Sequence, residues 1–208
     1  MAYTYTTLKQ AIQDYTDNDE AVFVSQIDNF IKNTEERILG EGQLEIFRKN
    51  ASATMTASNK YLPKPSDWLF TYSLSFTDGN GDINFIQNKD VNFIQEFWPD
   101  GTDTGSPRYY SDYDVDNFIL APTPSSNFTT EIHYFYRPTS IVSAGSSWLG
   151  TNAPTCLLYG SLVEAFTFMK GEPDMVQQYQ QLFMSAMQQL GKFSNTAEGL
   201  DFYKRPSA

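Results

Sequence analysis

Residues 156–171, CLLYGSLVEAFTFMKG, form the most apolar stretch of the chain, and their placement decides the fold. Between Cys156 and Met169 the stretch carries one formal charge, that of Glu164. A helix of this kind spans a membrane, forms the centre of a soluble core or packs against other copies of itself. Its length of about 24 Å is short of the roughly 30 Å hydrocarbon core of a bilayer. We therefore expect a central helix in a helical bundle.

One narrow strip of this helix consists of small or polar residues. Gly160, Glu164, Thr167 and Gly171 follow one another at i, i+4, i+7 and i+11, which places them on one side of a helix. Small residues let a second backbone approach closely, so the strip is a candidate subunit or bundle contact. We expect Glu164 to find a polar partner there or to reach solvent, because an unpartnered buried carboxylate is costly.

Apolar residues at helical spacing predict further helices at both ends of the chain. Two precede residue 42, the second ending at Gly40, and one runs from Pro173 to Gly191. The last helix has an uncharged polar face formed by Gln177, Gln178, Gln181 and Gln188. No such helix buries its apolar stripe alone, so the terminal helices are expected to pack together.

Between about residues 43 and 140 the period shifts to that of strands. Trp68, Phe70, Tyr72, Leu74 and Phe76 alternate with smaller or polar residues, which predicts one buried face. TDGNGD (77–82) predicts a hairpin turn, residues 90–98 a short helix stopped by Pro99, and residues 107–138 further strands. In the last run Thr130, Ile132, Tyr134 and Tyr136 are expected to share a face.

The expected fold class is therefore α+β, in four parts. Residues 1–42 supply the N-terminal helices of the bundle, 43–150 a β-rich insertion and 151–191 the C-terminal helices. Residues 192–208 have no periodicity and form either a disordered end or an extended docking arm. The docking reading rests on the apolar and basic residues Leu200, Phe202, Tyr203, Lys204 and Arg205.

Composition limits the chemistry. The net charge of −11 argues against a protein that grips nucleic acid phosphates, although it suits an acidic wall around DNA. The single cysteine excludes an internal disulfide and a cysteine metal cluster, and His133 is the only histidine. No cofactor, metal site or catalytic residue is expected, and no secretory leader is visible at the start of the chain.

Two acidic segments imitate metal sites. Residues 78–82 resemble the start of a calcium loop, but Ile83 and Lys89 stand where the loop glycine and the bidentate glutamate belong, so a turn is favoured. Asp112, Asp114 and Asp116 share one face if they lie on a strand, where they bind a cation or form a solvated rim. Abundant carboxylates also leave a glycan hydrolase open.

Aromatic residues on the β-rich part give the other binding hypothesis. Trp98, Tyr109, Tyr110 and Tyr113 are candidates to face a partner. They support an alternative function, that of a carbohydrate- or receptor-binding β module carried on helices.

Several stretches in order carry a family resemblance. Residues 107–138 followed by 148–175, together with 3–16 and 23–39, resemble the head-to-tail adaptor (connector) proteins of short-tailed phages, the tail tubular protein A-like components. The resemblance implies a structural virion protein of the phage neck, assembled in the host cytoplasm, and not an enzyme.

It also implies the partners. Such adaptors form a dodecameric ring between the portal protein and the tail nozzle protein, with the C-terminal arm on the portal and the β-rich part towards the nozzle or a tail fibre. DNA passes through the ring without specific binding and is retained after packaging, and no membrane is involved. Under the alternative above, the β-rich part is a carbohydrate- or receptor-binding module of a phage tail.

Overall fold

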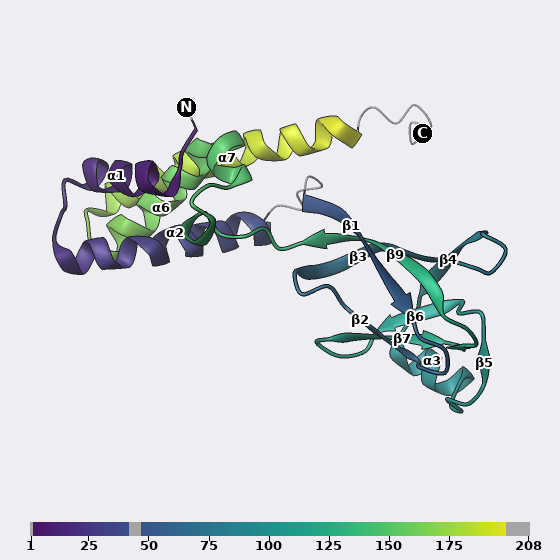
Figure 1. Cartoon of the computed structure of the whole chain (residues 1–208). Helices are drawn as coiled ribbons and strands as arrows, with labels where there is room; N and C mark the ends of the chain where they lie inside the picture. Colours follow the sequence, from purple (N-terminus) through teal and green to yellow (C-terminus); the bar gives the residue numbers. More distant parts are fainter. Residues whose placement is uncertain (1, 42–46, 199–208) are drawn as a thin grey trace, which may run out of the picture. The chain divides into compact units, whose positions relative to one another are not determined.

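The computed structural model describes residues 2–41 and 47–198, and the chain divides into two compact units (Figure 1). Residues 1–46 and 138–208 make the helical unit, and residues 47–137 make the β unit. The described part is mixed α+β, with seven helices and one large sheet. The β unit ends at Arg137 and not near residue 150, because residues 138–152 form two short helices that belong to the helical unit.

The helical unit surrounds the apolar stretch of residues 156–171. Its long helices are α1 (Tyr5–Thr16), α2 (Ala21–Glu41), α6 (Pro154–Phe168) and α7 (Pro173–Glu198), and its short ones are α4 (Ile141–Ala144) and α5 (Trp148–Asn152). Helix α6 packs against α1, α2, α5 and α7, which explains why it is apolar on nearly every side. Leu157, Leu162 and Ala165 on α6 are fully buried.

The sequence suggests that Gly171 takes the left-handed position that ends helix α6, but Lys170, one residue earlier, takes it. Lys170 takes the left-handed conformation with φ 54°, and the amide of Gly171 donates to the carbonyl of Phe166 at 2.9 Å. The amide of Lys170 donates to Thr167, which completes a Schellman motif with lysine at the position that glycine usually holds. The turn is therefore mildly strained at Lys170.

Helix α7 runs past the glycine that was expected to end it. The helix continues to Glu198, so the predicted helix end at Gly191 and the predicted start of the arm at residue 192 are both wrong. A single glycine inside a helix costs only about 1 kcal/mol, and Gly191 keeps a helical backbone without positive φ. The arm residues Leu200, Phe202, Tyr203, Lys204 and Arg205 lie outside the described residues.

The β unit is a seven-stranded sheet in the order β1-β9-β3-β4-β6-β7-β2. All neighbours pair antiparallel except β4 and β6, which are parallel and are connected through helix α3 (Val91–Phe97). The strands are β1 (Arg48–Met55), β2 (Tyr61–Pro63), β3 (Trp68–Thr77), β4 (Ile83–Asn88), β6 (Tyr109–Asp112), β7 (Asn117–Ala121) and β9 (Phe128–Tyr136); β5 (Thr104–Gly105) and β8 (Thr123–Pro124) form a separate pair.

One face of this sheet holds the core of the β unit. Thr130, Ile132 and Tyr134 of β9 are buried, as the alternation predicts, and Tyr136 is half-buried beside them. The buried core residues are Met55, Leu62, Leu74, Phe76, Ile86, Tyr110, Phe118, Leu120, Phe128, Ile132 and Tyr134.

The alternation fails in the first half of β3. Register shifts at Leu69 and Tyr72 interrupt its pairing with β9, so Phe70 and Tyr72 do not join Leu74 in the core. Phe70 is 45 % exposed and stacks on Phe135, with ring centroids 4.1 Å apart. The prediction that all five alternating residues share the buried face is wrong because each bulge shifts the pleat by one residue.

Candidate interaction surfaces

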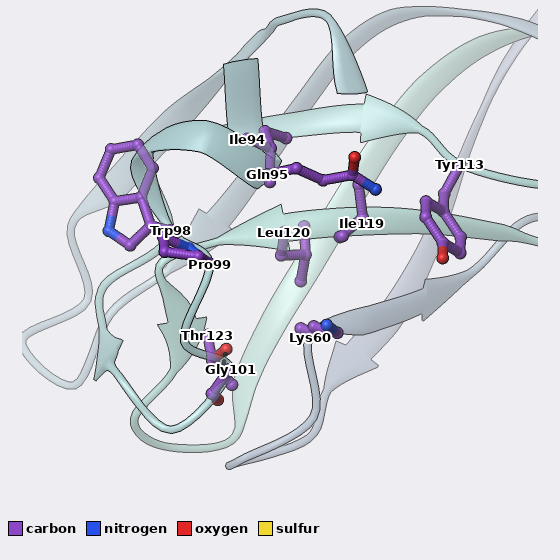
Figure 2. A pocket seen from close by; sticks show the side chains of 10 residues that line it. All are labelled: Lys60, Ile94, Gln95, Trp98, Pro99, Gly101, Tyr113, Ile119, Leu120 and Thr123. Atoms are coloured by element: carbon purple, nitrogen blue, oxygen red, sulfur yellow. Dashed lines mark hydrogen bonds between the residues drawn. The ribbon is translucent and has the colours of Figure 1, made fainter. Parts of the chain in front are cut away.

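A cavity of about 280 Å³ lies beside helix α3 in the β unit, and we name it the α3 pocket (Figure 2). Helix α3, the loop that follows it, strand β7 and the residue before β2 all contribute to its wall. The lining residues are Lys60, Ile94, Gln95, Trp98, Pro99, Gly101, Tyr113, Ile119, Leu120 and Thr123.

Local hydrogen bonds fix the walls of this pocket. The Asp90 side chain caps α3 by accepting from the amide of Asn92, and Ile94 anchors the helix in a small core with Ile119. In the loop after the helix, the Asp100 carboxylate accepts from both the hydroxyl and the amide of Thr102, which lowers the pKa of Asp100. Thr123 donates to the carbonyl of Gly101 at 3.0 Å. The pocket is therefore held open by the fold.

The electrostatics of the α3 pocket differ from those of the whole chain. Lys60 is the only charged residue that lines it, and no carboxylate does, although the chain has 25 acidic residues. Lys49 and Lys64 each contact an aspartate, Asp67 and Asp112 respectively. Lys60 has no ion pair within the described residues and lies 5.4 Å from the centre of the Tyr61 ring. Lys60 is thus the one charged side chain in the pocket lining, and the exposed Asp100 lies in the same loop as the lining residues Pro99 and Gly101.

The four aromatic residues singled out from the sequence do not act together. Tyr110 is buried in the core, edge-on to Phe118. Tyr109 packs against Trp98 with ring centroids 5.5 Å apart, and Figure 2 shows the Trp98 indole directed away from Tyr113. Only Tyr113 offers an exposed ring at the rim, where a hydrogen bond with Tyr61 raises the pKa of the Tyr113 hydroxyl.

Sequence reasoning missed Lys60 and Gln95, the charged and the amide side chain of the pocket lining. Neither belongs to a recognisable motif, and they come from segments far apart in the chain. The only available signal was the turn-rich sequence around them, which does not show what folds next to what.

The small-residue strip on α6 is buried at Gly160 and becomes more exposed towards the end of the helix. Gly160 is buried, and a Cβ atom there would stand 2.3 Å from the Thr34 side chain and 2.9 Å from the Phe183 ring. Helices α2 and α7 therefore fill the gap that Gly160 leaves. Glu164 accepts a hydrogen bond from the Asn33 side chain at 3.2 Å, which confirms the expectation of a polar partner. Thr167 and Gly171 continue the strip into exposed and half-buried positions.

The two acidic segments form turns. The Asp78 carboxylate accepts from the amides of Asn80 and Asp82, and the pKa of Asp78 is lowered by these bonds. Asp114 closes a second turn by accepting from the amides of Asp116 and Asn117. Within residues 2–41 and 47–198, no group of three acidic, histidine or cysteine side chains is placed to hold a metal ion.

A buried carboxylate joins the two halves of the helical unit. Glu35 on α2 is 7 % exposed and accepts from the amide of Ile141 at 2.9 Å, at the start of α4. Burial raises the pKa of Glu35 above its usual value, partly offset by this bond and by a bond with Ser140. Glu35 thus fixes the point where the chain returns from the β unit to the helices.

These features are those of a protein that binds other molecules through surfaces formed by its fold. Its β unit is inserted in the chain between two sets of helices. The model of the SU10 adaptor protein family matches residues 3–202, and the chain belongs to this family. The resemblance to phage head-to-tail adaptors is thereby confirmed, and the family is one of structural phage adaptors in the virion neck, not a class of enzymes.

No curated protein matches the chain. None of the helices between residues 2 and 198, apart from the undescribed 42–46, is both long and apolar enough to cross a membrane.

Proposed function

We propose that this protein forms a dodecameric ring between the portal and the tail nozzle of a short-tailed phage. The ring creates the channel for DNA and retains the packaged genome. The observation that carries the proposal is the adaptor family match over residues 3–202, which includes both units.

The helical unit supports ring formation. We propose that its helices form a bundle whose exposed side meets neighbouring copies. Gln177, Gln178, Gln181 and Gln188 of α7 are all exposed and uncharged. Amides donate and accept hydrogen bonds without the desolvation cost that buried charges carry, so this face suits contact between identical copies.

The charge supports a channel that does not hold its DNA. With a net charge of −11, the protein repels phosphate overall, and a smooth passage requires few phosphate contacts. The portal is the partner of the C-terminal arm, now restricted to residues 199–208, and the β unit carries the contacts with the nozzle or a fibre.

The decisive experiment mixes purified protein with portal and images the product. A ring of this protein on the portal is the expected result, and a monomer that never joins the portal would contradict the proposal. Glycan binding by a protein without portal affinity would favour the carbohydrate-binding alternative instead.

A truncation after Glu198 tests the arm while leaving α7 at its described length. It should remain folded and lose portal binding. A full-length variant with Phe202→Ser and Tyr203→Ser is the matched control for chain length and should show the same loss. Undiminished portal binding by both would overturn the arm assignment.

Particles that lack the protein test DNA retention. They should package DNA and then release it, because no adaptor closes the portal. Particles that keep their genome without the protein would contradict the retention role.

A further inference from the structure

We propose that the hairpin between β3 and β4 of one copy docks into the α3 pocket of the next copy in the ring. The inference rests on the proposed ring and names the residues through which the β units of neighbours make contact.

The first feature is the apolar tip of the hairpin, residues 78–85. Ile83 and Phe85 are 65 % and 72 % exposed, and they lie two residues apart on β4, on the same face. Their cross-strand neighbours are Thr77 and Ser75, which are too small to cover them. Two large apolar side chains presented together at a tip gain by burial against a partner.

The tip is rigid and acidic. Asp78 holds the turn through its bonds to the backbone, and Gly81 has φ +89°, so the turn is well defined. The Asp82 carboxylate, next to Ile83, makes no hydrogen bond or ion pair within the described residues. The tip therefore presents an apolar pair beside an unpaired negative charge.

The second feature is the α3 pocket, which is complementary to this tip. Ile94, Ile119 and Leu120 lie behind its floor and are each no more than 4 % exposed, so the accessible lining is mainly polar, and Lys60 supplies a positive charge without an ion pair among the described residues at one side (Figure 2). Gln95 extends across the opening from α3 towards Tyr113 (Figure 2). A pocket lined by one cation and no carboxylate favours an acidic occupant, and the hairpin tip is acidic.

Strand β4 runs from the turn at residues 78–82 towards α3, so the chain leads away from the tip before it reaches the pocket. Beyond Phe85 the last three residues of β4 span roughly 10 Å at 3.3 Å per residue. We therefore place the contact between copies. Because tip and pocket are different surfaces, the contact is head-to-tail, which is the kind that generates a ring when the rotation closes.

Other exposed aromatic residues of the sheet are weaker candidates for the occupant. Phe70 stacks on Phe135, and Tyr72 contacts His133 and the guanidinium of Arg48. No ring contact involves Phe85 within the described residues. Phe85 is therefore the most exposed aromatic side chain of the β unit.

Charge exchange tests the contact. Lys60→Glu and Asp82→Lys should each reduce ring assembly on the portal by about tenfold or more, because each places like charges together. The double variant restores the opposite pair in exchanged positions and should recover most of the assembly. Asp116→Lys, which changes an exposed acid on another turn, is the matched control and should neither weaken assembly nor rescue Lys60→Glu.

A cysteine pair gives an independent readout. Phe85→Cys and Gln95→Cys proteins, mixed on the portal and oxidised, should form a disulfide dimer, whereas either protein alone should not. The native Cys156 is buried and does not compete.

The outcomes separate this inference from the proposed function. Normal rings from Lys60→Glu, without the mixed disulfide, would overturn the hairpin contact and leave the ring intact. Loss of nozzle binding in Lys60→Glu particles with complete rings would show that the pocket serves another protein, which also overturns the inference. Failure of the unaltered protein to form a ring would overturn both proposals.

Discussion

The helical unit and the β unit are assembled from the chain in opposite ways. The β unit is one continuous segment, residues 47–137, whereas the helical unit combines helices from both sides of that segment. In the helical unit a single apolar helix, α6, touches most of the others, but the core of the β unit is shared among many strands. The comparison indicates that the stability of the helical unit depends on a few positions around α6. The stability of the β unit is spread over core residues from many strands.

The largest expected effect comes from removing one core ring in each unit. Phe183→Ala in α7 and Phe118→Ala in β7 should each cost about 3–5 kcal/mol of unfolding free energy. Phe183 is fully buried against Gly160, and Phe118 lies between Trp68 and Tyr110.

Urea unfolding followed by two signals separates the units. Circular dichroism at the helical minimum reports mainly the helical unit. In a Trp148→Phe background, which removes the one tryptophan of the helical unit, tryptophan fluorescence reports Trp68 and Trp98 of the β unit. Phe183→Ala should shift the first signal and Phe118→Ala the second. Equal shifts of both signals in both variants would show one cooperative unit and would break the comparison.

Gly160→Ala should destabilise the helical unit by about 1–3 kcal/mol, although alanine normally favours helices. The added methyl would stand 2.3 Å from Thr34, so α2 or α7 must move. Thermal unfolding measures the loss. The control Gly191→Ala meets no atom within 4 Å and should be neutral or stabilising, which distinguishes crowding from helix propensity.

How far the sequence predicts this molecule also differs between the units. The α6 pattern, the turn at residues 77–82 and the short helix before Pro99 could be read directly, because each depends on neighbours in the chain. The bulges in β3 and the walls of the α3 pocket could not. Tyr72 leaves the core because of its pairing with β9, and Lys60 meets Gln95 only through the sheet order.

Helix ends show the same limit on a smaller scale. Glycine often ends a helix, but α7 continues past Gly191 to Glu198. A glycine ends a helix only where the residues after it are more stable outside the helix than in it. Lys170 looks unremarkable, yet it takes the left-handed position. The residue types at these two sites therefore do not by themselves indicate where the helices end.

Glu35 provides a test of the joint between the two halves of the helical unit. Glu35→Ala should cost about 1–2 kcal/mol, because the buried amide of Ile141 loses its acceptor. Glu35→Gln keeps an acceptor and avoids a buried charge, so it should be neutral or stabilising at neutral pH.

The pH dependence of the glutamine variant follows from the raised pKa of Glu35. The folded state holds the proton above the ordinary value of 4.5, so unaltered protein loses stability as pH rises from 4.5 through the raised pKa. The advantage of Glu35→Gln should grow over that interval and then level off, as measured by urea unfolding at several pH values. An advantage that is constant with pH would contradict a charge-based cost.

The smallest expected effect is at the end of α6. Lys170→Gly should stabilise the helical unit by about 0.5–1 kcal/mol, because glycine takes a φ of 54° without strain. Gly145 has φ +75° and open space around it, so Gly145→Ala should destabilise by a similar amount. Thermal unfolding of the pair checks the conformational argument, and stabilisation by both would refute it.

The pairing of β1 with β9 has a consequence for the order of folding during synthesis. Arg48 and Phe135, close to the two ends of the β unit, are partners in that ladder. The ribosome delivers α1 and α2 first, but α6 emerges only after the whole sheet has been made. Once the sheet forms, its two ends lie side by side, which shortens the loop that the late helices must close to reach the early ones. Pairing of β1 with β9 therefore lowers the entropic cost of bringing α6 and α7 to α1 and α2.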